Sequence, residues 1–236
     1  MNFSLKQNKN LIFNGLVILT SIASLIGLQK LYLNAANQTQ QDYARQSKAA
    51  ATSLAVQKRF PSFGYDNLVA DWAFLQFIQY FGDTDARNAT DYSLVPDYFE
   101  MVVNNDPRFL KAELMLSTAN TVFAGKPQQT VNNLDKAVPF LSPEINRRAY
   151  AAWQYKGLDE MMFLGDIEAA KYSYQMAAKW AKEVGEERIV NRVTQTVTFL
   201  EDNPDSKRAR VTGLVTILSN APDAKTRKEV IKEIES

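Results

Sequence analysis

Hydrophobic and polar positions form distinct blocks along the chain, and the first hydrophobic block is the longest. Residues 11–28 carry no charge and are interrupted only by asparagine, threonine and serine, with Lys6 and Lys9 before them and Lys30 after them. A helix of about 20 apolar residues crosses the hydrocarbon core of a bilayer. The pattern therefore predicts an N-terminal transmembrane anchor over residues 1–33.

A cleaved signal peptide and a buried core helix are the alternatives for this segment. The uncharged run is longer than the roughly 7–15 residues of a signal-peptide core, which favours an uncleaved anchor. Lysine and arginine flank it on both sides, so the charge rule for orientation is nearly balanced. The short N-terminal flank favours an extracytoplasmic position for the rest of the chain, with the cytoplasmic side left open. We therefore expect a single-pass membrane protein.

The next segment is polar and rich in alanine, and it precedes a longer region of helical pattern. Residues 34–59 lack a broad apolar face, which predicts a helical stalk or linker. Proline and glycine at 60–64 then interrupt any helix. We expect one helical domain over residues 60–236.

Within 60–236, apolar blocks of helical length alternate with short breaks that contain glycine, proline or aspartate. No block shows sustained alternation with a period of two, so strands are not expected. Paired helices with short loops are typical of a short α-solenoid, and the fold class is all-α. The expected helices cover 65–81, 92–105, 108–124, 128–140, 145–164, 167–183, 186–202, 206–219 and 223–235.

Small and aromatic residues recur at fixed distances around two of these breaks. The stretch from Trp153 to Ala177 resembles one unit of the tetratricopeptide repeat family, with a glycine–aspartate turn followed by a small residue, an aromatic residue and alanine. A weaker unit lies about forty residues upstream, which is more than the usual spacing of about 34. The resemblance implies that six residues hold the repeats together: Gly125, Ala137, Gly165, Ala170, Tyr174 and Ala177.

The same resemblance implies a scaffold that binds another protein in a groove lined by the first helix of each hairpin. The groove is either open to a partner or closed by packing against neighbouring helices. Methionine and tyrosine suit the recognition of an apolar helix or peptide. The matching positions are Ala152, Tyr155, Asp159 and Met162 in one unit and Ala112, Met115, Ala119 and Val122 in the other, and our candidates among them are Tyr155, Asp159, Met162, Met115 and Val122.

The expected helix over 65–81 is apolar almost all the way round. It is either a central buried helix or an aromatic surface for a partner or a membrane interface. On the second interpretation Trp72 and Phe74 are further candidates for protein binding.

Four short sequence motifs extend the resemblance to membrane-anchored tetratricopeptide proteins of cyanobacteria and plastids: FGYDNL at 63–68, DW at 71–72, FIQYFGD at 77–83 and YKG at 155–157. This resemblance implies a scaffold or assembly factor for a photosynthetic membrane complex, with the domain in the thylakoid lumen or periplasm. The alternative is a permanent structural subunit of a larger membrane protein complex.

Composition argues against catalysis. The chain has no cysteine and no histidine, which removes thiolate nucleophiles and the side chain best suited to proton transfer near neutral pH. A net charge of +1 gives no basic field for a nucleic acid. The adjacent acidic residues Asp159 and Glu160 are interpreted as part of a solvated face. We expect no enzyme activity, no cofactor and no metal.

Overall fold

The structure is a computed structural model that describes residues 3–35, 40–203, 205, 207–221 and 223–235, with the side chains in these ranges except those of 3–13, 31–35, 40 and 225. All secondary structure in the described residues is helical, which confirms the all-α prediction. The contacts divide the chain into two compact units, Met1–Arg45 and Gln46–Ser236.

The first unit consists mainly of helix α1 (Phe3–Ala35). Over the described residues, no helix combines the length and the apolar character that crossing a bilayer requires. The predicted transmembrane anchor over 1–33 and the predicted single-pass membrane protein are therefore wrong. The part of the expected stalk at 36–39 lies outside the described residues.

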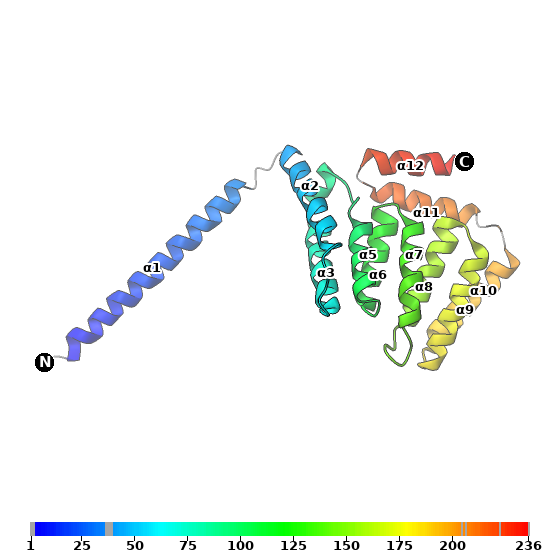
Figure 1. Cartoon of the computed structure of the whole chain (residues 1–236), viewed down its shortest axis with the longest axis horizontal. Coiled ribbons are helices and arrows are strands. Elements are labelled where there is room, and N and C mark those ends of the chain that lie inside the picture. The colour runs from blue at the N-terminus through cyan, green and yellow to red at the C-terminus, as the bar shows by residue number, and fades with distance from the viewer. Residues whose placement is uncertain (1–2, 36–39, 204, 206, 222, 236) are drawn as a thin grey trace. The chain divides into compact units, whose positions relative to one another are not determined.

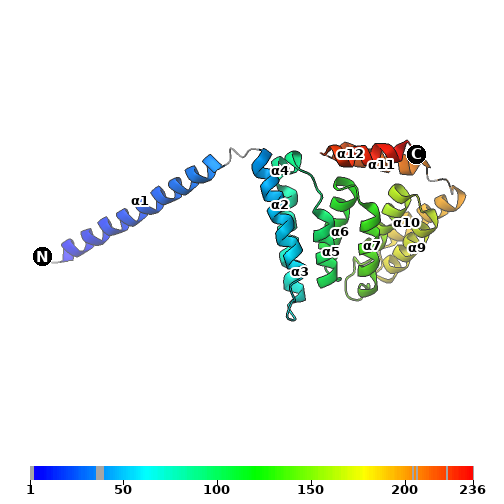
Figure 2. The ribbon, with the colours of Figure 1, turned by 45° about the horizontal axis from the view of Figure 1, so that its top comes forward.

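The second unit contains helix pairs that follow one another along the chain. Helices α3 and α5 to α10 stand side by side, and α11 and α12 lie across one end of them (Figure 1, Figure 2). The elements are α2 (Gln40–Gln57, of which the part from Gln46 belongs to this unit), α3 (Asp66–Gly82), α4 (Thr84–Ala89), α5 (Val95–Asn105), α6 (Leu110–Thr118), η1 (Ala119–Phe123), α7 (Pro127–Ala137), η2 (Val138–Phe140), α8 (Tyr150–Asp159), η3 (Glu160–Leu164), α9 (Ile167–Glu183), α10 (Glu187–Asp202), α11 (Lys207–Asn220) and α12 (Ala224–Ile234).

The second half of α2 packs on this unit. Leu54 is buried among residues of α3 and α5, and the Lys58 ammonium pairs with the carboxylates of Asp97 and Glu100 on α5. The second compact unit thus begins at Gln46, inside the segment 34–59 that the sequence pattern predicts to be a stalk or linker.

Helix α3 has two apolar faces with different environments. Ala70, Ala73, Phe77 and Tyr80 are buried, and the last three belong to the largest core cluster, where Phe77 contacts Phe81 and Tyr98. The opposite side of the helix remains exposed. The buried side of α3 agrees with the interpretation of segment 65–81 as a core helix, and its exposed side agrees with the interpretation as an apolar surface.

Two elements depart from the expected helix ranges. The short helix α4 begins where the Asp83 carboxylate accepts a hydrogen bond from the Ala86 amide, in a region with no expected helix. Helix α8 begins at Tyr150 rather than 145, because residues 142–149 form consecutive turns closed by the bonds of Ser142 and Asn146.

Candidate partner-binding surfaces

Four of the predicted groove residues lie around one pocket. Val122, Tyr155, Asp159 and Met162 border a space of about 280 Å³ between η1, α8, η3 and α11. Met115 is 41 % exposed and does not line this pocket, and Ala112 and Ala119 are buried. The remaining lining residues are Ser117, Thr118, Thr121, Leu158, Phe163 and Thr216.

The first helices of the two hairpins end in the same way. Each ends in a π-helical turn, η1 or η3, followed by a glycine in the left-handed region, Gly125 with φ +64° and Gly165 with φ +71°. The amide of Lys126 donates to the Asn120 carbonyl at 2.9 Å, and the amide of Asp166 donates to the Glu160 carbonyl at 2.8 Å. Glycine adopts a positive φ without the strain that a side chain would cause. This turn therefore explains why glycine occupies both positions.

Alanine and tyrosine occupy the expected packing positions of the same hairpins. Ala137, Ala170 and Ala177 are fully buried, and Tyr174 is nearly so. Gly157 on α8 lies close to Tyr174, since a Cβ added there would be 3.3 Å from its ring. Small residues on one helix thus let the neighbouring helix approach.

A buried polar network crosses between the two hairpins below the pocket. Asn120 Nδ2 donates to Thr130 Oγ1 at 3.0 Å, and the hydroxyls of Thr121 and Thr130 are 2.9 Å apart. Thr121 Oγ1 also donates to Asp159 Oδ2 at 3.0 Å. Burial raises the pKa of the Asp159 carboxyl well above its usual range. The network joins hairpin α6–α7 to helix α8.

A second buried group lies beside it and contains an ion pair. The Lys156 ammonium pairs with the Glu160 carboxylate one turn later and, at 3.2 Å, with the Asp135 carboxylate on α7. Ser173 Oγ on α9 donates to Glu160 Oε2 at 2.7 Å. The prediction that Asp159 and Glu160 form a solvated face is therefore wrong. Both side chains are buried: Asp159 contacts Thr121 of η1, and Glu160 contacts Lys156 of α8 and Ser173 of α9.

Helix α11 closes one side of the pocket. A Cβ on Gly213 would be 2.4 Å from the Met162 carbonyl oxygen, so the α11 backbone contacts η3 directly. Leu214 and Ile217 are buried with Phe163. These contacts limit the access of a large partner to the predicted groove.

A more accessible apolar surface lies on α3, the end of α2 and the turn between these helices. We define the α3 surface as Val56, Phe60, Phe63, Leu68, Trp72 and Leu75, all of which are exposed; Trp72 is 56 % exposed. Several of these residues, together with Gln57, Pro61, Val69 and Met101, line a hollow of about 340 Å³. Of the two candidates on this helix, Trp72 belongs to the surface. Phe74 is half-buried and packs against Phe77 and Phe109.

The α3 surface could be identified from sequence only in part. The pattern indicated an apolar helix with Trp72, but not which face would remain open. Phe60, Leu68 and Leu75 were not among the candidates, since an exposed leucine has the same sequence signal as a buried one.

Among the described residues, no group of three or more acidic side chains is placed to hold a metal ion. Comparison of the chain with protein-family models, curated proteins and solved structures gives no match. The resemblance to tetratricopeptide proteins therefore stays a prediction from the residues alone.

Proposed function

We propose that this protein is a helical scaffold that binds a protein partner through the α3 surface. The observation that carries the proposal is the exposure of Leu68, Trp72 and Leu75 on one side of a helix whose other side forms the core. Large exposed apolar patches on folded proteins mark interaction sites. Tryptophan, moreover, is among the residues that contribute most to binding energy at protein interfaces.

The two ends of the helical unit differ in the way that this function requires. In stacked helical repeats, the terminal helices carry a polar outer face that keeps the protein soluble. Helix α12, in the last hairpin, has a charged exposed side that includes Arg227, Lys228 and Glu229. At the other end of the unit α2 packs against one side of α3, and α3 still presents Trp72 and Leu75 to solvent. A partner polypeptide bound to α3 would bury these apolar side chains, as a capping helix does at the end of a repeat protein.

The groove between the hairpins is the weaker candidate for a protein interface. Its pocket of about 280 Å³ is bordered by α11, and the buried carboxyl of Asp159 lies at its base. An interface of ordinary size buries about 800 Å² on each partner. The α3 surface offers an extended face without such an obstruction.

A permanent structural subunit is the second candidate, because obligate interfaces are more apolar than transient ones. The resemblance to assembly factors of photosynthetic membranes remains a prediction about the identity of the partner. The fold does not bear on it.

Affinity capture with matched variants tests the proposal. The double variant Leu68→Gln/Trp72→Gln changes the α3 surface, and Phe199→Gln/Val215→Gln changes two exposed apolar residues of α10 and α11. We expect proteins captured by the wild type to be lost by at least about tenfold with the first variant, because a central tryptophan contributes on the order of 2 kcal/mol. The second variant should retain them. Equal capture by all three proteins would contradict the proposal.

The oligomeric behaviour of residues 46–236 distinguishes the two candidates. A scaffold that exchanges partners should be monomeric and folded when expressed alone. A permanent subunit should associate or aggregate through the α3 surface, and the double variant at Leu68 and Trp72 should prevent this.

A further inference from the structure

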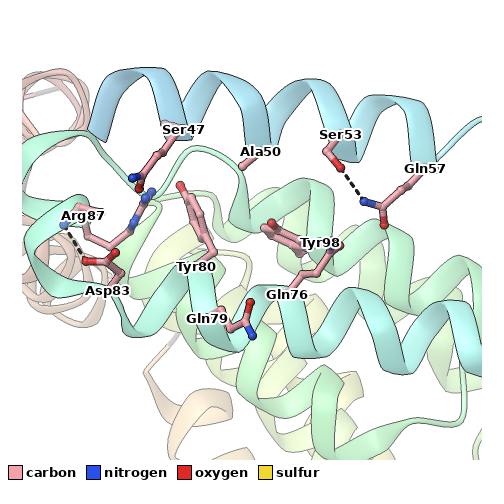
Figure 3. A pocket seen from close by; sticks show the side chains of 12 residues that line it. Ser47, Ala50, Ser53, Gln57, Gln76, Gln79, Tyr80, Asp83, Arg87 and Tyr98 are labelled. Atoms are coloured by element: carbon pink, nitrogen blue, oxygen red, sulfur yellow. Dashed lines mark hydrogen bonds between the residues drawn. The ribbon is translucent and has the colours of Figure 1, made fainter. Parts of the chain in front are cut away.

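A second pocket, chemically different from the α3 surface, lies between α2, α3 and α4. It has a volume of about 290 Å³, near the lower limit for small-molecule sites. In Figure 3 the side chain of Arg87 extends from α4 toward Ser47 on α2 and lies beside Tyr80. The lining residues are mostly polar and uncharged: Gln46, Ser47, Ala50, Ser53, Gln57, Gln76, Gln79, Tyr80, Asp83, Ala86, Arg87 and Tyr98.

Arg87 is a buried cation at the edge of this pocket. The residue is only 4 % exposed, and its guanidinium lies 3.6 Å from the centroid of the Tyr80 ring. One of its terminal nitrogens donates to the Asp91 carbonyl at 2.6 Å, while Nε has no partner among the described residues. A guanidinium has five N–H donors, and burying a charge without a counter-charge is costly.

The neighbouring groups do not neutralise it. Among the described residues, no carboxylate forms an ion pair with Arg87. The Asp83 carboxylate accepts from the Ala86 amide, and that of Asp91 accepts from the amide and hydroxyl of Ser93. Burial raises the pKa of Tyr80 to about 12, so this phenol is uncharged at neutral pH.

The uncharged groups of the pocket supply both kinds of hydrogen-bonding capacity. Hydroxyls of Ser47 and Ser53 and the amide of Gln79 are potential donors. Gln57 Oε1 and Gln76 Oε1 are buried acceptors that have no partner among the described residues. A buried acceptor without a partner is unfavourable, and a ligand that carries a donor would satisfy it.

We propose that this pocket binds a small organic monocarboxylate that also carries a hydroxyl or amino group. The planar fork of Arg87 matches a carboxylate, and the second group would donate to the glutamine oxygens. A multiply charged anion fits less well, since Arg87 is the single cation in the lining and Asp83 is an anion. Gln57 lines both this pocket and the hollow of the α3 surface, whereas Arg87 lies in this pocket and outside the α3 surface.

Two neighbouring alanines of α2 provide a matched pair of variants. Ala50 lines the pocket, whereas Ala49 is exposed and does not. Ala50→Met fills the pocket and leaves Arg87 in place, and Ala49→Met adds the same side chain outside it. Arg87→Met removes the cation itself. Thermal unfolding of each ligand-free variant shows whether it still folds.

Isothermal titration of the purified full chain tests the proposal with four probes: L-serine, 2-hydroxyisobutyrate, isobutyramide and inorganic phosphate. We expect saturable binding of at least one of the first two, weaker by about tenfold or more in Ala50→Met and unchanged in Ala49→Met. Arg87→Met, if folded, should weaken binding by at least as much as Ala50→Met does. Absence of binding by both carboxylates would overturn the proposal, as would equal binding of isobutyramide, preferential binding of phosphate, or unchanged affinity in Ala50→Met.

Discussion

Thr121 Oγ1 donates a hydrogen bond to Asp159 Oδ2 at 3.0 Å, which connects the π-helical turn of one hairpin to the first helix of the next. Because burial raises the pKa of Asp159, the folded protein binds this proton more tightly than the unfolded chain does. The stabilising effect is therefore complete below the unfolded pKa of about 4 and is lost as pH rises toward the folded pKa.

Asp159→Asn should remove this pH dependence. We expect the free energy of unfolding of the variant, relative to wild type, to increase between pH 4 and pH 7 by about 1–2 kcal/mol. Urea denaturation at several pH values measures the difference, and Asp202→Asn on the exposed end of α10 is the control. Parallel pH profiles for wild type and Asp159→Asn would contradict the expectation.

Glu113 offers a separate pH effect with a defined range. Its side chain is fully buried, neither carboxyl oxygen has a partner in the described part of the chain, and burial raises its pKa to about 8. The stability that the protonated Glu113 carboxyl contributes is fully present below about pH 4.5 and is lost as the pH rises to about 8.

Glu113→Gln, which cannot ionise, should therefore be more stable than wild type at pH 9 by on the order of 1–3 kcal/mol and should lose this advantage at pH 4. Denaturant unfolding at the two pH values measures this, with the exposed Glu187→Gln as control. A variant that is less stable than wild type at pH 9 would show that Glu113 has a partner when ionised.

The close approach of α11 to η3 predicts a strong effect at Gly213. Gly213→Ala would place a Cβ 2.4 Å from the Met162 carbonyl oxygen, so α11 must move away. We expect a loss of about 1–3 kcal/mol in stability. Gly82→Ala, where a Cβ meets nothing within 4 Å, should be neutral or slightly stabilising. Equal midpoints of thermal unfolding for the two variants would argue against the tight contact.

Removal of one member of the buried ion pair should cost far more than removal of an exposed one. Lys156→Met leaves the Glu160 carboxylate buried without its cation, for which we expect a loss of about 3 kcal/mol. Lys171→Met, which breaks the pair with the exposed Glu168, should cost under about 1 kcal/mol. In the double variant Lys156→Met/Glu160→Gln, part of the loss should be recovered, and purely additive losses would contradict the coupling.

Helix positions follow closely from the sequence, since they depend on local patterns. Gly125 and Gly165 mark the turns after η1 and η3, and the expected helix over 167–183 coincides with α9. The buried alanines at 137, 170 and 177 follow from the same spacing.

Burial of polar residues could not be deduced in this way. Asp159 and Glu160 are adjacent in sequence, and only contacts with Thr121 and Ser173, which come from other helices, place them inside. Arg87 likewise gave no sequence signal, because its environment depends on contacts with Tyr80 of α3 and the Asp91 carbonyl. The transmembrane prediction, which relied on the hydropathy of residues 11–28, was wrong, because no helix of the described residues has both the length and the apolar character of a membrane span.

The position of α11 and α12 has a consequence for how the helical unit unfolds. In an open row of repeats each unit contacts only its neighbours, and segments can melt one at a time. Here the Lys126 ammonium pairs with the Glu229 carboxylate at 3.1 Å, and Val230 is buried with Phe163 of a different hairpin. The last hairpin thereby links two earlier ones directly. Loss of α12 therefore exposes apolar surface on both of these hairpins. We expect the hairpins to unfold cooperatively, as one unit.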